Sequence, residues 1–131
     1  MKGAKPQLRT DRAALASVPR PPAWLAKDAK AEWRRTMPLL VERRILTDAD
    51  LGTLESYCTA VARIREAERT IANEGSTYMS TSGPKRHPAV TIQDAAMKTA
   101  RLCAAELGLT PVSRSRPTIR DDEDDADSLL D

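Results

Sequence analysis

Aromatic residues are scarce in this chain. They make up 3% of its 131 residues, and phenylalanine is absent. The hydrophobic fraction is still 40%, an ordinary value for a soluble protein. A core must therefore be built from Leu, Ile, Val, Met and Ala. Because alanine favours helices and lets them pack closely, this composition indicates a mainly helical single domain with tails.

Long apolar runs are also lacking. No run approaches the ~20 residues that a transmembrane helix needs, so we expect no membrane span. The longest apolar patch near the basic N-terminus, residues 13–18, is broken by Ser17 and ended by Pro19. It is too short for a secretory signal, which leaves an Arg-rich transit peptide as the alternative.

Cysteine and histidine are too few for most catalytic or metal sites. Cys58 and Cys103 are interpreted as small buried side chains of a protein from a reducing cytoplasm, with a disulfide as the alternative. His87 is the only histidine and lacks a local nucleophile or metal-ligand companions, so we expect it to contact phosphate or cap the following helix. Gly-rich phosphate loops, paired-Cys zinc motifs and Gly-x-Ser-x-Gly are absent. We therefore expect no enzyme, no cofactor and no metal.

The net charge of +2 hides a strong asymmetry. Residues 121–131 contain seven acids and no base, which leaves +9 on residues 1–120. A basic body favours a polyanion as partner, with solubility as the alternative reason for the charge.

One long helix is predicted from Thr47 to Gly75. Thr47 suits an N-cap, Asp50 completes a weak capping box, and Gly75 suits the left-handed residue that closes a helix. Apolar side chains recur at three- and four-residue steps, which predicts a core or oligomer seam. The seam residues are Leu54, Tyr57, Val61, Ile64 and Ile71.

A shorter helix is predicted before it, roughly at residues 27–44. Trp24 and Trp33 are expected in its core, and Pro38 is expected to kink it. The close connection to Thr47 resembles a helix-turn-helix, although short links between helices are common.

After Gly75 the helical pattern stops. Residues 76–88 indicate a short β-hairpin or ordered loop with a turn at Ser82–Pro84, and a second long helix is predicted at about 89–107. Its main stripe is Ile92, Ala96, Cys103 and Leu107. The predicted fold is mainly α: a kinked N-terminal helix, then a long antiparallel helical hairpin with the β-hairpin or loop between the long helices, and disordered tails. We divide the chain into a flexible basic arm (1–22), a helical oligomerisation and DNA-binding domain (23–117) and an acidic tail (118–131).

Basic side chains outside the helices are the candidate DNA contacts, because Lys and Arg neutralise phosphates. They are Lys2, Lys5, Arg9, Arg12, Arg20, Lys85, Arg86, Arg114, Arg116 and Arg120. In residues 121–131, Leu129 and Leu130 are the only large apolar residues and are the candidate partner-binding pair. For the basic arm the alternative is a solvated linker, and for the acidic tail it is a disordered segment that increases solubility.

The order of several short motifs resembles the small terminase subunits of tailed double-stranded DNA phages, specifically the P27 family. The resemblance covers roughly residues 20–117. The motifs are Leu46–Asp50, Leu54 with Tyr57 and Cys58, Glu74–Gly75, Gly83–Pro88, Leu107–Pro111 and Ser113–Arg114. The pairing of His87–Pro88 with Leu107–Pro111 is the most distinctive of them.

The resemblance implies a non-catalytic DNA-packaging factor in the cytoplasm of an infected bacterium. Such a protein forms a homo-oligomeric ring, binds double-stranded viral DNA and recruits the large terminase subunit, which holds the ATPase and nuclease activities. Two alternatives come from the residues themselves. A dimeric helix-turn-helix regulator would read DNA with residues 34–50, and a nuclease would use acids with a metal.

Overall fold

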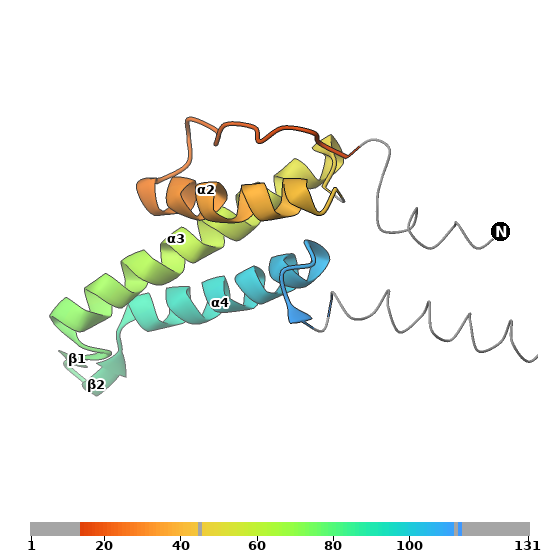
Figure 1. The fold of residues 1–131 in the computed structure, drawn as a ribbon. Helices are drawn as coiled ribbons and strands as arrows, with labels where there is room; N and C mark the ends of the chain where they lie inside the picture. Colours follow the sequence, from red (N-terminus) through yellow and green to blue (C-terminus); the bar gives the residue numbers. More distant parts are fainter. Residues whose placement is uncertain (1–13, 45, 112, 114–131) are drawn as a thin grey trace, which may run out of the picture.

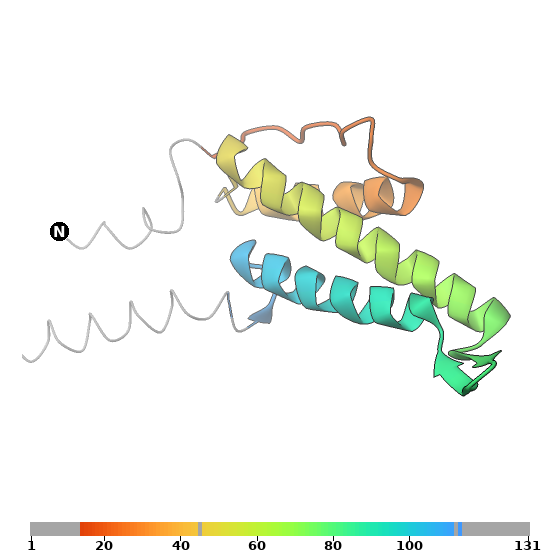
Figure 2. The same ribbon diagram turned by 180° about the vertical axis from the view of Figure 1, so that it is seen from behind.

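A helix of 24 residues, α3 (Leu51–Glu74), runs through the middle of the fold in this computed structural model (Figure 1). The structure describes residues 14–44, 46–111 and 113. Helix α2 (Lys27–Glu42) packs along one side of α3 and helix α4 (Pro88–Glu106) along the other, an order that the view from behind repeats (Figure 2). The antiparallel strands β1 (Thr77–Ser80) and β2 (Gly83–Arg86) join α3 to α4. The predicted fold, mainly helical with a hairpin between two long helices, is confirmed.

The ends of α3 follow its capping residues. Oδ2 of Asp50 accepts hydrogen bonds from the backbone N–H of Thr47 at 2.9 Å and from its hydroxyl at 3.1 Å, as in the predicted capping box. The first turn, η1 (Asp48–Asp50), is a 3₁₀ helix rather than the α-helical turn that we predicted. At the other end Gly75 has a φ of +87°, a left-handed conformation that glycine adopts without a steric penalty.

Helix α4 begins and ends close to its predicted bounds. Pro88 occupies its first turn, and Nδ1 of His87 accepts a hydrogen bond from the backbone N–H of Ala89 at 3.0 Å. The capping role predicted for His87 is therefore confirmed. Gly108, with a φ of +71°, follows the last helical turn.

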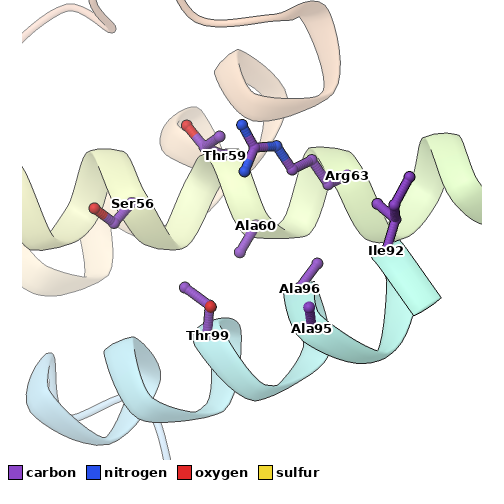
Figure 3. Close-up of a pocket in the computed structure, with 8 residues that line it drawn as sticks. All are labelled: Ser56, Thr59, Ala60, Arg63, Ile92, Ala95, Ala96 and Thr99. Atoms are coloured by element: carbon purple, nitrogen blue, oxygen red, sulfur yellow. The ribbon is translucent and has the colours of Figure 1, made fainter.

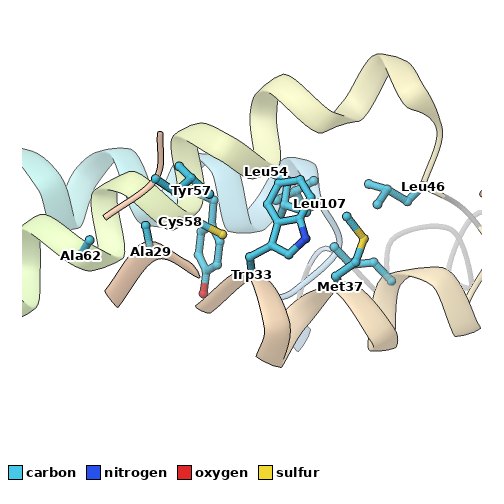
Figure 4. Close-up of a cluster of buried hydrophobic side chains, with 11 residues drawn as sticks. Ala29, Trp33, Met37, Leu46, Leu54, Tyr57, Cys58, Ala62 and Leu107 are labelled. Atoms are coloured by element: carbon cyan, nitrogen blue, oxygen red, sulfur yellow. The ribbon is translucent and has the colours of Figure 1, made fainter. Parts of the chain in front are cut away.

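The core lies where the three helices meet at the α2–α3 connection (Figure 4). Trp33 and Met37 of α2 point toward Leu54 and Cys58 of α3, and all four side chains are almost fully buried. Burial of each large apolar side chain contributes about 1.5–3 kcal/mol. The core residues are Leu25, Ala29, Trp33, Met37, Leu40, Leu46, Leu54, Tyr57, Cys58, Ala62 and Leu107.

Two apolar residues expected in the core are exposed instead. Trp24 is 65% exposed because α2 begins only at Lys27, and Leu25 takes the buried place before the helix. Ile92 is 53% exposed because α4 turns the neighbouring Gln93 toward α3. Nε2 of Gln93 donates to the backbone oxygen of Ile64 at 3.3 Å.

The predicted seam of α3 is only partly buried within the chain. Leu54 and Tyr57 belong to the core, whereas Val61, Ile64 and Ile71 are half-buried. Because α3 packs against helices on two sides, fully buried positions also fall on its alanines. These are Ala60, Ala62 and Ala67.

The hairpin turn lies earlier than we predicted. Ser80 pairs with Gly83 and Met79 with Pro84, so the turn consists of Thr81 and Ser82, and Pro84 belongs to β2. Gly83 has a φ of +109°, a value that side chains disfavour. Pro84 is tolerated because a two-stranded sheet has only edge strands.

The segment before α2 is irregular but joined to the fold. The backbone N–H of Leu15 donates to the oxygen of Leu46 at 2.8 Å, and Nε1 of Trp33 donates to the oxygen of Pro19 at 3.0 Å. These two hydrogen bonds tie residues 15 and 19 of the predicted arm to the fold, and the flexibility of the arm stays a prediction. Helix α2 continues past Pro38 to Glu42, and the kink at Pro38 stays a prediction. Within the described residues, no helix combines the length and apolarity needed to span a bilayer.

Candidate nucleic-acid interface

Only three of the predicted DNA contacts fall within the described residues. Arg20, Lys85 and Arg86 are all exposed, and Arg86 lies 3.9 Å from the carboxylate of Asp94. The remaining predicted residues lie outside the described part of the chain. They are Lys2, Lys5, Arg9, Arg12, Arg114, Arg116, Arg120 and the tail pair Leu129 and Leu130.

The structure separates the hairpin tip from the two chain ends. Leu15 is bonded to Leu46, and Nη1 of Arg43 donates to the backbone oxygen of Gly108 at 2.8 Å. These contacts place both ends of the described chain at the pole where α3 begins (Figure 1). Lys85 lies in the hairpin at the other end of α3, roughly 36 Å away at 1.5 Å per residue.

A buried carboxylate links α2 and α3, and the sequence analysis missed it. Glu32 has only 2% of its side chain exposed. An acid buried to this degree requires partners, and three side chains supply them. Arg35 donates to both carboxylate oxygens, from Nε at 2.9 Å and from Nη2. The Tyr57 hydroxyl donates to Oε2 at 2.7 Å, and Nη2 of Arg65 lies 3.5 Å from Oε1. Two guanidinium groups and a phenol therefore surround one carboxylate.

The pKa shifts in this network have clear causes. The hydrogen bond from Arg35 holds the pKa of Glu32 below its ordinary value, although burial acts in the opposite direction. Burial raises the pKa of Tyr57 to about 12, and the hydrogen bond to Glu32 adds to this effect. At neutral pH, Glu32 is therefore ionised and Tyr57 is protonated. Burial also raises the pKa of Cys58 to about 12, which fits the small buried side chain that we predicted.

A second ion pair extends this network along the two helices. Nη2 of Arg69 donates to Oδ2 of Asp28 at 2.7 Å. That hydrogen bond lowers the pKa of Asp28, and the charges of Arg65 and Lys27 act in the same direction. We call Arg35, Arg65 and Arg69, with the acids beneath them, the arginine cluster.

A sequence signal for the cluster exists in hindsight. Glu32 directly precedes Trp33 in the buried stripe of α2, and Arg35 follows three residues later on the same helix face. An acid at a buried helix position requires a basic partner. The partner on α3 could be named only once the antiparallel packing of the two helices was known.

A groove of about 400 Å³ lies between α3 and α4 (Figure 3). A second hollow of about 340 Å³ shares Arg63 and Ile92 with it and extends to His87. The Thr59 hydroxyl is buried beside the groove and has no hydrogen-bond partner among the described residues. The groove is lined by Ser56, Thr59, Ala60, Arg63, Ile92, Ala95, Ala96 and Thr99.

The α2–α3 pair lacks the geometry of a DNA-reading helix-turn-helix. Asp28 near the start of α2 meets Arg69 in the last third of α3, so the helices lie antiparallel along their length. Helix-turn-helix units cross at about 90–120°. Leu54 and Tyr57, on the first turns of the would-be recognition helix, are buried in the core. Among the described residues, no group of three or more His, Cys, Asp or Glu side chains could hold a metal ion.

Comparison with protein families identifies the chain. Residues 29–124 match the family described as "Phage terminase, small subunit". The chain belongs to this family. The predicted resemblance is thereby confirmed at the level of the phage terminase small subunit, while the narrower P27 assignment stays a prediction. No match was found among the curated proteins or among the solved structures.

The family match covers nearly all of the helical part of this terminase small subunit. It begins two residues inside α2, includes α3, the hairpin and α4, and extends to residue 124. It therefore contains Arg114, Arg116 and Arg120 and enters the acidic tail, beyond the limit near 117 that we expected. Residues 1–28 and 125–131, with the whole basic arm and the pair Leu129 and Leu130, lie outside it.

Proposed function

We propose that this terminase small subunit is a ring-forming, non-catalytic DNA-binding adaptor. In the cytoplasm of the infected bacterium it recognises the viral packaging site and recruits or stimulates the large terminase ATPase and nuclease. The observation that carries the proposal is the family match across α2, α3, the hairpin and α4. The distribution of charge and the exposed apolar surface support it further.

Basic residues are concentrated in two segments of the sequence that flank the described part of the chain. The described residues contain fourteen Lys and Arg against eleven Asp and Glu, a surplus of only three. Residues 1–13 add another surplus of three, and so do residues 114–120. Both segments adjoin described residues that lie at the same pole. Residues 121–131, which follow the second segment, carry seven acids and oppose its charge. The basic side chains of the two segments favour phosphate contacts, because counterions are released from DNA when its phosphates are neutralised.

Exposed apolar side chains on α4 support assembly into a ring. Ile92, Met97 and Leu102 are between 41% and 68% exposed. The α3–α4 groove beside Ile92 offers a concave surface to a neighbouring subunit. A ring needs two different surfaces on each subunit that fit one another. Many weak DNA contacts around such a ring add to overall affinity.

The first test measures mass by light scattering after gel filtration, together with duplex DNA binding over a salt series. We expect one species of many subunits whose DNA affinity falls steeply with salt. A strict monomer would contradict the ring, and a dimer with a tightly bound palindromic site would favour a transcription regulator. Cleavage that depends on a divalent ion would contradict the non-catalytic role.

The acidic tail is proposed to contact the large subunit through Leu129 and Leu130. These residues are isolated apolar side chains in a run of acids. Deleting residues 121–131 is expected to weaken association with the large subunit, measured by co-purification, while the light-scattering mass stays that of the intact ring. A matched Leu129→Ser/Leu130→Ser variant keeps all seven acids and separates apolar docking from charge. If both variants associate with the large subunit as strongly as the parent chain does, Leu129 and Leu130 are not the contact.

A further inference from the structure

The arginine cluster presents positive charge outward and keeps its acids beneath. Arg35, Arg65 and Arg69 are 59%, 44% and 62% exposed, whereas Glu32 is 2% and Asp28 27% exposed. Three guanidinium groups thus cover two carboxylates. The exposed acid Glu66 lines the same hollow as Asp28 and Arg69, so this surface carries three arginines beside one exposed carboxylate.

The packing of two helices fixes the order of these arginines. Asp28, Glu32 and Arg35 are spaced four and three residues apart, so they share one face of α2. Arg65 and Arg69 are four apart on α3, and their contacts with Glu32 and Asp28 join the two faces. From Asp28 to Arg35 the cluster spans about 10 Å of helix. One strand of a DNA duplex presents about three phosphates over that length of its axis.

We propose that the arginine cluster is a contact site for the phosphate backbone of double-stranded DNA; this inference rests on the DNA-binding function proposed above. A guanidinium has five N–H donors, so one bond to a carboxylate leaves donors for a phosphate oxygen. Arg65 and Arg69 each use Nη2 for their ion pair. Holding the side chains in place beforehand reduces the entropy lost when DNA binds.

The buried acid explains why arginine suits these positions. Arginine pairs bidentately with carboxylate and phosphate, whereas lysine acts as a point charge. Glu32 orients Arg35 through two hydrogen bonds and also contacts Arg65. Such contacts position the protein on DNA without reading its sequence. The cluster therefore contributes affinity, and sequence choice comes from elsewhere in the assembly.

The test compares variants of the full chain by fluorescence anisotropy with one labelled DNA duplex over a salt series. Arg65→Ala/Arg69→Ala removes two outward guanidinium groups. Arg34→Ala is the matched control, because Arg34 is exposed on α2 and lies outside the cluster, the core and the α3–α4 groove. Arg65→Lys keeps the positive charge but loses the planar guanidinium that can bind a phosphate through two parallel hydrogen bonds. Circular dichroism checks that each variant is folded, and the single Arg69→Ala, which breaks only a solvent-accessible pair, serves where the double variant is destabilised.

We expect affinity to fall about tenfold for each guanidinium removed. The slope of log affinity against log salt should decrease by about one for each lost contact. Arg34→Ala should change neither the affinity nor the slope strongly, and Arg65→Lys should keep the slope while lowering affinity. If the parent chain binds DNA and the cluster variants bind equally well, the site is wrong and the proposed function stands. An equal loss of affinity in Arg34→Ala would also overturn the site, whereas a parent chain that does not bind DNA would overturn both proposals.

Discussion

Glu32 joins two helices that otherwise meet through apolar side chains and the Asp28–Arg69 ion pair. Its carboxylate accepts hydrogen bonds from Arg35 on its own helix and from Tyr57 on α3. A buried acid is unfavourable unless every oxygen is satisfied, and here both oxygens are bonded. The network therefore adds a directional contact between α2 and α3 to the apolar packing of Trp33, Met37 and Leu54.

Replacing Glu32 with Gln is expected to destabilise the fold by about 2 kcal/mol at neutral pH, because charge-assisted hydrogen bonds are lost. The pKa of Glu32 is lowered in the folded chain. Its contribution is therefore complete above its ordinary value of 4.5 and disappears as pH falls through the lowered folded value. Urea unfolding between pH 7 and pH 3 measures both effects.

The Glu32→Gln variant should show a weaker acid dependence than the parent chain. Some dependence should remain below about pH 3.8, because the pKa of Asp28 is also lowered by its bond to Arg69. Glu42→Gln, on the exposed end of the same helix, is the matched control. Identical pH profiles for the Glu32 variant and the parent chain would contradict the stabilising role of the carboxylate.

At the scale of elements, helix ends were the most predictable features. Thr47, Gly75 and Pro88 each act through local backbone chemistry, so their positions can be read from a few neighbouring residues. It was less predictable which side chains of each helix face its neighbours. Ile92 is exposed while Gln93 faces α3. Which of these two neighbouring residues faces α3 depends on how α4 is rotated about its axis, and the packing against α3 sets that rotation.

The arginine cluster escaped the sequence analysis for the same reason. Its members are separated by up to 41 residues, and only the antiparallel pairing of α2 and α3 brings Asp28 to Arg69. Sequence reasoning instead chose basic residues in segments without helical pattern. Of those, Arg20, Lys85 and Arg86 are exposed as expected, but the hairpin pair lies at the pole opposite the chain ends.

The His87 cap offers a prediction for α4. Replacing His87 with Ala removes the acceptor for the N–H of Ala89 and should destabilise the fold by about 1 kcal/mol, as loss of an N-cap commonly does. For a domain of this size the melting temperature would fall by about 4–8 °C. His87→Asn keeps a capping oxygen and should retain most of the stability. Equal melting temperatures for the Ala variant and the parent chain would contradict the cap.

At the scale of the whole molecule, the fold brings the two ends of the described chain to one pole. Residues 1–13 and 114–120 adjoin described residues at the end where Arg43 bonds to Gly108. Arg65 and Arg69 lie in the last ten residues of α3, so the arginine cluster is nearer to the hairpin than to this pole. DNA contacted by both the basic segments and the cluster would therefore run along α3 on one subunit.

Deleting residues 1–13 tests this arrangement. The deletion ends just before Leu15, whose bond to Leu46 holds the following segment, so the fold should persist. It removes four basic residues, and the slope of log DNA affinity against log salt should fall by about 3–4 if all of them contact phosphate.

Lys85→Ala/Arg86→Ala is the control at the opposite pole, because it removes two exposed charges from the hairpin. If DNA binds at the pole where the chain ends lie, the slope of log affinity against log salt should fall more per removed charge in the deletion than in the hairpin variant. An equal change in slope per removed charge would mean that the chain attracts DNA only through its overall electrostatic field. A local contact depends on where a charge lies, whereas a general attraction depends only on how many charges there are.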